Sequence, residues 1–143
     1  MQTFNKRRTA ELKHGRVAML AVVGLIAADV ARFPGSIDLD GTTFNSIPNG
    51  VGALSAINPF GWFQIAASIG YWEIFGWKQT EGAPIGDFGF PGNDWDSYDE
   101  EKKNELRLKE LQNGRIAMIG AIELLAHDFS ERANHGLFDL AWY

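Results

Sequence analysis

The sequence contains no cysteine and no excess of basic residues. Without cysteine the chain forms neither disulfide bonds nor thiolate metal sites. The net charge is −5, whereas a nucleic-acid-binding protein usually has an excess of basic residues, so no nucleic-acid partner is expected. A secretory signal peptide is also not expected, because the first apolar run follows a charged stretch and lacks a cleavage-site pattern. The length of 143 residues suits a single domain.

Charged residues gather in three clusters, with apolar stretches between them: residues 6–16, 94–115 and 127–139. The pattern predicts helices at about residues 9–32, 59–77 and 101–127. The second segment has about 19 residues with aromatic side chains at both ends, as expected of a membrane span. The first has an uncharged run of only 12 residues, 17–28. We still expect it to span a membrane, because the helix begins earlier with polar groups that have partners.

Two stretches of the sequence repeat each other at an offset of 99 residues. Residues 11–19 read ELKHGRVAM and residues 110–118 read ELQNGRIAM, so six of nine positions are identical. The match predicts that the first and third helices have equivalent roles and are related by a pseudo-two-fold axis. Gly15 and Gly114 occupy equivalent positions and would let the two backbones approach closely.

Each copy of the repeat places a glutamate and an arginine at the border of an apolar stretch. Glu11 and Arg16 are five residues apart, which separates them by about 140° around a helix, so they do not face each other. A lone charge is costly beside a membrane interior. We therefore expect the helices to exchange partners, with Glu11 paired to Arg115 and Glu110 paired to Arg16.

An ion-paired glutamate still has a second oxygen that can bind a hard cation such as Mg²⁺. His14 and Asn113 follow the two glutamates by three residues, which places each on the neighbouring part of the same helix face. One copy of this pattern would be weak evidence, and His14 alone is more often a surface or capping residue. Two copies favour two equivalent ligand sites.

The paired E-x-x-[HN]-G-R-x-A-M motifs resemble those of the chlorophyll-binding light-harvesting superfamily of photosynthetic eukaryotes. The resemblance covers the first and third helices and their spacing, and so nearly the whole chain. It implies an all-α membrane protein with three transmembrane helices, the first and third crossed. It also implies axial ligands to chlorophyll magnesium at four positions: Glu11, His14, Glu110 and Asn113.

The resemblance suggests three further chlorophyll ligands. His127 stands fourteen residues after Asn113, where the family often has glutamine, and this spacing keeps it within about 40° of the same helix face. The alternative for His127 is a polar cap at a membrane interface. In the second helix the candidates are Gln64 and Glu73. Glu73 has no obvious cationic partner in its helix, which favours a ligand role over a lone buried charge.

The short form of the chain and two stretches, RFPG (32–35) and DWDSYDEE (94–101), resemble the chlorophyll a/c branch of the superfamily. This branch includes fucoxanthin–chlorophyll proteins and peridinin–chlorophyll a/c membrane antennae. It implies chlorophyll a, chlorophyll c and a carotenoid of the fucoxanthin, peridinin or diadinoxanthin type. GDFGF (86–90) resembles the family's loop beside a central carotenoid.

The resemblance predicts a light-harvesting antenna and not an enzyme. The expected location is the plastid thylakoid membrane, which the chain is expected to cross several times. The expected partners are a photosystem I or II core, neighbouring antenna subunits and thylakoid lipids. The basic residues at 6–8 favour a stromal N-terminus, and three spans then place the C-terminus in the lumen.

Two alternatives remain open from the sequence. One is a photoprotective, energy-dissipating member of the same superfamily, for which lumenal carboxylates that titrate at acidic pH would be the signal. Its candidates are Asp128, Glu131 and Asp139. The other is a soluble helical interaction module, which would be stable without detergent or pigment.

Overall fold

The computed structural model describes residues 2–79, 82, 84–88 and 97–131. Four α-helices are present in this part of the chain: α1 (Gln2–Val30), α2 (Ala53–Ala56), α3 (Pro59–Tyr71) and α4 (Glu100–Glu131). Three short helical turns accompany them: the 3₁₀ turns η1 (Phe44–Ser46) and η2 (Gly50–Gly52), and the π-helical turn η3 (Trp72–Gly76). The described residues include no β-strand, only one isolated bridge between Ser36 and Thr43. The prediction of an all-helical fold is confirmed for these residues.

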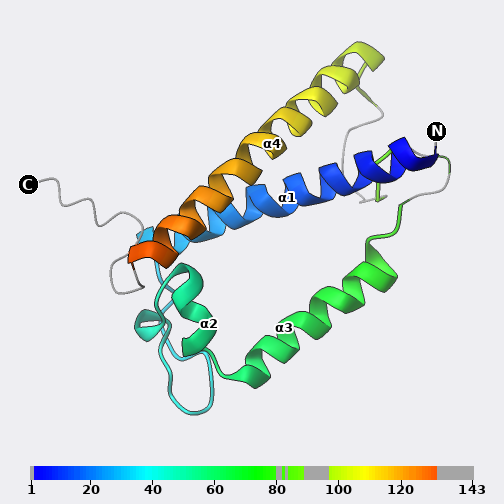
Figure 1. The fold of residues 1–143 in the computed structure, drawn as a ribbon. Coiled ribbons are helices and arrows are strands. Elements are labelled where there is room, and N and C mark those ends of the chain that lie inside the picture. The colour runs from blue at the N-terminus through cyan, green and yellow to red at the C-terminus, as the bar shows by residue number, and fades with distance from the viewer. Residues whose placement is uncertain (1, 80–81, 83, 89–96, 132–143) are drawn as a thin grey trace, which may run out of the picture.

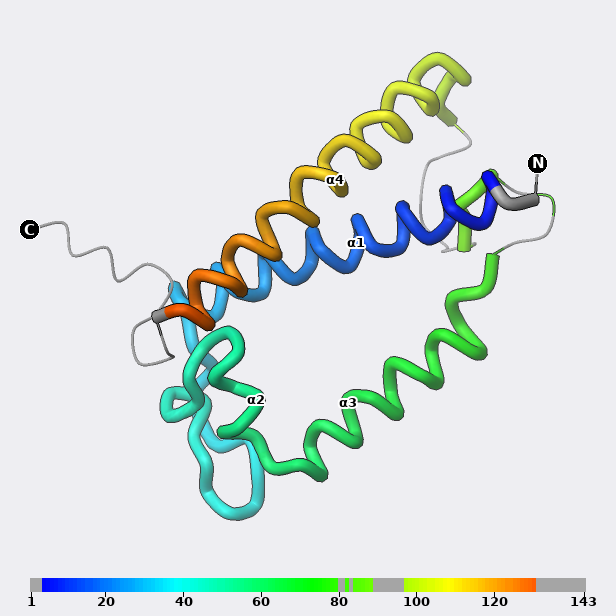
Figure 2. The backbone as a smooth tube through the Cα atoms, in the orientation of Figure 1, coloured from blue at the N-terminus to red at the C-terminus, as the bar shows by residue number. Residues whose placement is uncertain are grey.

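The two long helices α1 and α4 form a crossed pair that runs in the same general direction (Figure 1). α3 runs the opposite way and lies apart from this pair over most of its length (Figure 1). The tube view shows that the connection between α1 and α3 gathers near the C-terminal ends of α1 and α4 (Figure 2). Because α1, α3 and α4 alternate in direction, α1 and α4 run parallel to each other. This arrangement is consistent with the equivalent roles that the repeat predicts for the two helices.

α1 and α4 approach most closely at the two glycines of the repeat. A Cβ atom on Gly15 would lie 3.0 Å from the Cα of Gly114, and a Cβ on Gly114 would lie 3.0 Å from the Cα of Gly15. Three of the four buried hydrophobic residues, Ala18, Leu111 and Ala121, also belong to these helices. Small residues at the crossing therefore bring the backbones into direct contact.

The helix boundaries differ from the predicted ones at three places, one of which is the end of α4 at Glu131 instead of about residue 127. α1 begins at Gln2 instead of near residue 9, because the basic residues before the repeat contain no helix breaker. The second predicted helix, 59–77, divides into α3 and η3. α3 begins with Pro59 at its first position, and the Asn58 side chain accepts a hydrogen bond of 2.9 Å from the Phe60 amide. Both features are typical of a helix N-terminus.

The end of α4 is fastened to the 3₁₀ turn η2. Asp128 is buried, and its carboxylate accepts a hydrogen bond of 2.6 Å from the Val51 amide. Gly50 has a φ of +61°, and a Cβ atom there would lie 2.2 Å from Asp128 Oδ2. This contact explains why the connection between α1 and α3 gathers beside the end of α4 (Figure 2).

The described polypeptide encloses little apolar core of its own. Only four of its hydrophobic residues are buried, and no large side chain is fully buried in the part of the chain that the structure describes. Large apolar side chains instead lie 62–79% exposed along both long helices: Val17, Leu20, Val23 and Val30 on α1, and Ile116, Ile119, Ile122 and Phe129 on α4. The members of these two stripes are again 99 residues apart. In the described segments, none of the helices is both long enough and apolar enough to cross a membrane.

Candidate functional site

Two ion pairs join α1 and α4 on either side of the glycine crossing. Arg16 Nε donates a hydrogen bond of 2.6 Å to Glu110 Oε1. Arg115 Nε donates a hydrogen bond of 2.7 Å to Glu11 Oε1. The structure therefore contains the exchange of partners that helix geometry demands, because neither glutamate can face the arginine of its own repeat.

The Arg16 side chain is also held by the segment that follows the second helix. Arg16 Nη1 donates a hydrogen bond of 2.7 Å to the Gly86 carbonyl, and the guanidinium lies 5.4 Å from the centre of the Phe88 ring. The Gln79 amide donates to the Pro84 carbonyl and accepts from the Gly86 amide, both at 2.8 Å. These contacts fix Arg16 in the direction of Glu110.

Gly86 occupies a position that only glycine suits. Its φ is +89°, and a Cβ atom would lie 3.0 Å from Leu12 Cδ1 and 3.3 Å from Arg16 Nη2. Gly86 begins the GDFGF stretch that resembles the family's loop beside a carotenoid. Its last two residues, 89 and 90, lie outside the described residues.

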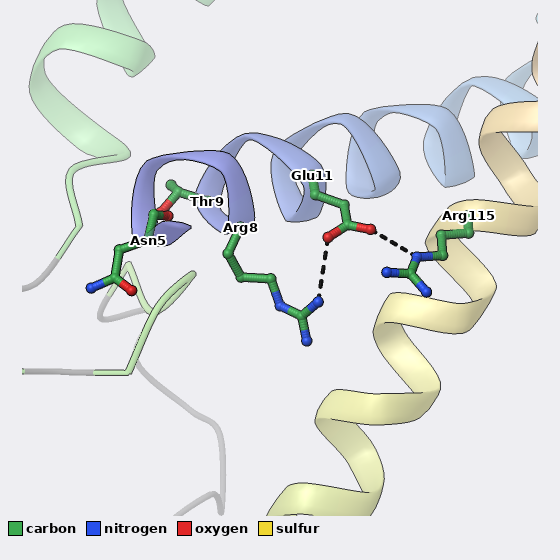
Figure 3. A network of polar contacts seen from close by, with 5 residues as sticks. All are labelled: Asn5, Arg8, Thr9, Glu11 and Arg115. Atoms are coloured by element: carbon green, nitrogen blue, oxygen red, sulfur yellow. Dashed lines mark hydrogen bonds and ion pairs between the residues drawn. The ribbon is translucent and has the colours of Figure 1, made fainter. Parts of the chain in front are cut away.

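Glu11 has a different environment, because two arginines contact it. Arg115 donates to Oε1, and Arg8 Nη1 donates to Oε2 at 3.3 Å (Figure 3). Arg8 comes from the preceding turn of α1, where the Thr9 hydroxyl donates a hydrogen bond of 2.9 Å to the Asn5 carbonyl (Figure 3). Both oxygens of Glu11 therefore have a cationic partner.

His14 is exposed on α1, and its ring has a defined hydrogen bond. The Nδ1 atom lies 2.6 Å from the Ala10 carbonyl oxygen. Because a carbonyl only accepts, Nδ1 carries the proton, and the lone pair of neutral imidazole is then on Nε2. This is the arrangement of a metal-ligating histidine, in which one nitrogen is oriented by the backbone and the other binds the metal.

Asn113 and Gln64 are both exposed, on α4 and α3 respectively. Neither carboxamide has a hydrogen-bond partner within the described part of the chain. Each oxygen is accordingly available to a ligand. His127 is exposed near the end of α4, and its role as a ligand stays a prediction.

Glu73 has a cationic partner that the sequence does not reveal. Lys13 Nζ, from α1, donates to Glu73 Oε2. Glu73 has no cationic partner within its own helix, as predicted, but the partner from α1 means that the lack of one no longer favours a ligand role. Glu73 lies in the π-helical turn η3, a kind of turn that is frequent at functional sites. Its role as a ligand stays a prediction.

Sequence reasoning missed three residues that shape this site: Arg8, Lys13 and Gln79. The sequence did contain a signal for Arg8, because the repeat continues toward the N-terminus. Asn5 and Arg8 match Asn104 and Arg107 at the same offset of 99 residues. Lys13 had none, because 60 residues separate it from Glu73 and only the tertiary structure brings them together.

A family model described as "Chlorophyll A-B binding protein" matches residues 1–129 of the chain. Fucoxanthin-chlorophyll a-c binding protein E of Phaeodactylum tricornutum, a chloroplastic protein, is 45% identical over 131 residues, covering 89% of this chain and 66% of the relative. Protein F of the same organism is 47% identical over 131 residues with the same coverage. Fucoxanthin-chlorophyll a-c binding protein E of Macrocystis pyrifera is 40% identical over 145 residues, covering 98% of this chain and 68% of the relative. The chain spans about two thirds of the length of these curated relatives.

Proposed function

This chain belongs to the chlorophyll a-b binding protein family, and from that premise we propose that it is a light-harvesting antenna that binds chlorophylls a and c and a carotenoid. The observation that carries the proposal is the pair of matched ligand sets on two crossed helices. Each set has an ion-paired glutamate followed by a nitrogen or oxygen ligand: Glu11 with His14, and Glu110 with Asn113.

The side chains of these sets have the chemistry to hold the magnesium of a chlorophyll. Glu110 Oε1 accepts from Arg16, which neutralises the carboxylate and leaves Oε2 for the metal. His14 carries its proton on Nδ1, beside the Ala10 carbonyl, so Nε2 has the lone pair that a metal requires. The Asn113 carboxamide oxygen is a hard ligand of the kind that Mg²⁺ favours. Gln64, Glu73 and His127 are proposed as further ligands on the resemblance.

When bound, the pigments absorb light and pass the excitation to their neighbours. The polypeptide performs no bond chemistry in this function, so its contribution is to hold and orient the pigments. The crossing at Gly15 and Gly114, with a Cβ-to-Cα approach of 3.0 Å, and the two ion pairs fix α1 against α4. Ligands on both helices are thereby held at set positions relative to each other.

We further propose that the chain is embedded in the thylakoid membrane of a plastid with three transmembrane helices. Support comes from the matched stripes of exposed apolar side chains on α1 and α4, since apolar surfaces of this extent call for cover by lipid, pigment or another protein. The alternating directions of α1, α3 and α4 suit three passes (Figure 1). The basic residues at 6–8 favour a stromal N-terminus and a lumenal C-terminus.

Its proposed partners are a photosystem core, neighbouring antenna subunits and thylakoid lipids. The relatives named as fucoxanthin-chlorophyll a-c binding proteins favour fucoxanthin among the candidate carotenoids. Three carboxylates are candidates for a photoprotective role. Asp128 accepts a hydrogen bond from the Val51 amide, and the side chains of Glu131 and Asp139 are not among those that the structure describes. Family membership and the scarcity of buried core in the described residues favour the antenna over a soluble interaction module.

The proposal is tested by refolding the chain in detergent with a pigment extract that contains chlorophylls a and c and carotenoids. After free pigment is removed, absorption and pigment extraction report the bound chlorophyll. We expect the wild-type chain to retain chlorophyll a, with a Soret shoulder from chlorophyll c. An Arg16→Ala, Glu110→Ala double variant should lose chlorophyll, because it removes one ligand and the ion pair that supports it.

Glu123→Ala is the matched control, since Glu123 is an exposed carboxylate on α4 outside the repeat. It should bind as much chlorophyll as the wild type. A helical but colourless wild-type chain would refute the antenna function. Equal pigment in the double variant and in the Glu123→Ala control would show that the ion-paired glutamate is not a pigment site.

A further inference from the structure

The two glutamates of the repeat have different partners despite their equivalent positions in the sequence. Within the described segments, Glu110 has one cationic partner, Arg16, at Oε1. Glu11 has two, because Arg115 contacts Oε1 and Arg8 contacts Oε2 (Figure 3). The oxygen of Glu11 that corresponds to the free oxygen of Glu110 is therefore already engaged.

The repeat itself supplies an arginine equivalent to Arg8, and it behaves differently. Arg107 lies 99 residues after Arg8, three residues before Glu110. Its Nη1 atom donates to Asn104 Oδ1 at 3.1 Å, in the direction away from Glu110. The contact with Glu11 is thus particular to Arg8 and is not a general consequence of an arginine at this position.

The arginines across the helix crossing also differ. Arg16 is held by the Gly86 carbonyl and the Phe88 ring in addition to Glu110, and its side chain is 34% exposed. Arg115 has Glu11 as its partner and is 55% exposed. The Glu110 side of the crossing is therefore the more preorganised one, and preorganised groups lose less freedom when a ligand binds.

We propose that Arg8 competes for Oε2 of Glu11 and thereby makes the Glu11 position the weaker of the two pseudo-symmetric chlorophyll sites. The inference rests on the proposed antenna function and deepens it. A chlorophyll magnesium bound at Glu11 Oε2 would compete with Arg8, whose Nη1 atom lies 3.3 Å from this oxygen. In the described segments, Glu110 Oε2 has no such competitor. The two sites then fill in order, Glu110 first and Glu11 second, as chlorophyll becomes available.

The test is refolding in detergent at graded ratios of chlorophyll a to protein, with bound chlorophyll per polypeptide as the readout. Glu11→Ala and Glu110→Ala variants identify which pigment belongs to which glutamate. In the wild type, the pigment that Glu11→Ala removes should be the later one to fill. Arg8→Gln should lower the chlorophyll concentration for its half-saturation by roughly two- to five-fold, the range that loss of an exposed ion pair allows. Arg107→Gln is the matched control and should leave it unchanged.

Three results would overturn the inference: equal half-saturation of the two pigments in the wild type, the reverse filling order, or equal behaviour of Arg8→Gln and Arg107→Gln. Far-UV circular dichroism checks that each variant has refolded. If Arg8→Gln does not refold, Arg8→Ala decides, because it also removes the cation beside Glu11 Oε2 and should shift half-saturation in the same direction. A wild-type chain that binds no chlorophyll at any ratio would instead refute the antenna function, so the two failures are distinguishable.

Discussion

At the scale of single residues, two glycines decide how closely α1 and α4 approach. The nearest neighbour of each added Cβ atom is a backbone atom of the other glycine, which cannot rotate away as a side chain can. The arginines and glutamates then lie close enough to reach across the crossing. The small residues and the charges of the repeat therefore act together, because the ion pairs need the short distance that the glycines allow.

Gly114→Ala should destabilise the protein by about 1–3 kcal/mol, the usual cost of overpacking a tight contact. The added methyl group would lie 3.0 Å from the Gly15 Cα atom and would force the helices apart. The measurement is the midpoint of thermal denaturation of the refolded protein in detergent, monitored by circular dichroism.

Gly120→Ala is the control on the same helix, since a Cβ atom there meets nothing within 4 Å. It should be neutral or stabilising by up to about 1 kcal/mol through helix propensity. Equal midpoints for the two variants would mean that the helix crossing is not limited by this contact.

At the scale of helices, the crossed pair and α3 are held by different means. α1 and α4 share the glycine crossing and two ion pairs. α3 lies apart from them over most of its length (Figure 1). Its continuation η3 is joined to α1 by the ion pair of Lys13 and Glu73. This contact gives Glu73 a role in positioning the second helix, whether or not it also binds a pigment.

Reversing one charge of this pair should widen the separation of α1 and α3, because two like charges would then face each other. The variants are Lys13→Glu, Glu73→Lys and the double reversal, which should restore the wild-type separation. The absence of native cysteine allows two spin labels to be attached at Ala10→Cys and Ala67→Cys, both exposed positions. Pulsed electron paramagnetic resonance then measures the distance between labels. The same distance in all four proteins would show that the pair does not position α3.

At the scale of the whole molecule, the described polypeptide is held by contacts between its helices and turns more than by an apolar core. Four buried hydrophobic residues in the described part of the chain are few for a polypeptide of this length. The apolar stripes on α1 and α4 are exposed. Under the proposed function, lipid and pigment would cover them. Among the polar contacts, Asp128 joins the end of α4 to the η2 turn and so fastens the connection that leads to α3.

Asp128→Ala should loosen this connection by about 1–3 kcal/mol, because the Val51 amide would lose its acceptor. The measurement is hydrogen–deuterium exchange. Protection of the amides at residues 50–56 should fall, whereas protection of the amides at the glycine crossing should not change. Glu123→Ala, an exposed change on the same helix, should leave both regions unchanged. Unaltered exchange at residues 50–56 in Asp128→Ala would mean that other contacts fasten the turn.

The helical class could be predicted from the amino-acid sequence, as could the equivalence of the first and last helices and the family. These follow from local patterns, namely the apolar segments and the repeat at an offset of 99 residues. It also predicted which arginine faces which glutamate, because helix periodicity forbids the pairing within one repeat. Ligand roles for seven residues came from the same patterns and from the resemblance, and they remain proposals.

The contacts that distinguish the two halves could not be predicted from the repeat and are seen in the folded structure. Arg8 shares Glu11 with Arg115, whereas Arg107 donates to Asn104. The Gly86 carbonyl accepts a hydrogen bond from Arg16, and the Gly86 amide donates to Gln79. Lys13 is the partner of Glu73. The physical reason is that a sequence repeat specifies equivalent backbones, whereas the loops and distant helices that pack against each copy differ. The different surroundings of Arg16 and Arg115 therefore arise from long-range packing, whereas Arg8 and Arg107 each make their contact within one helix.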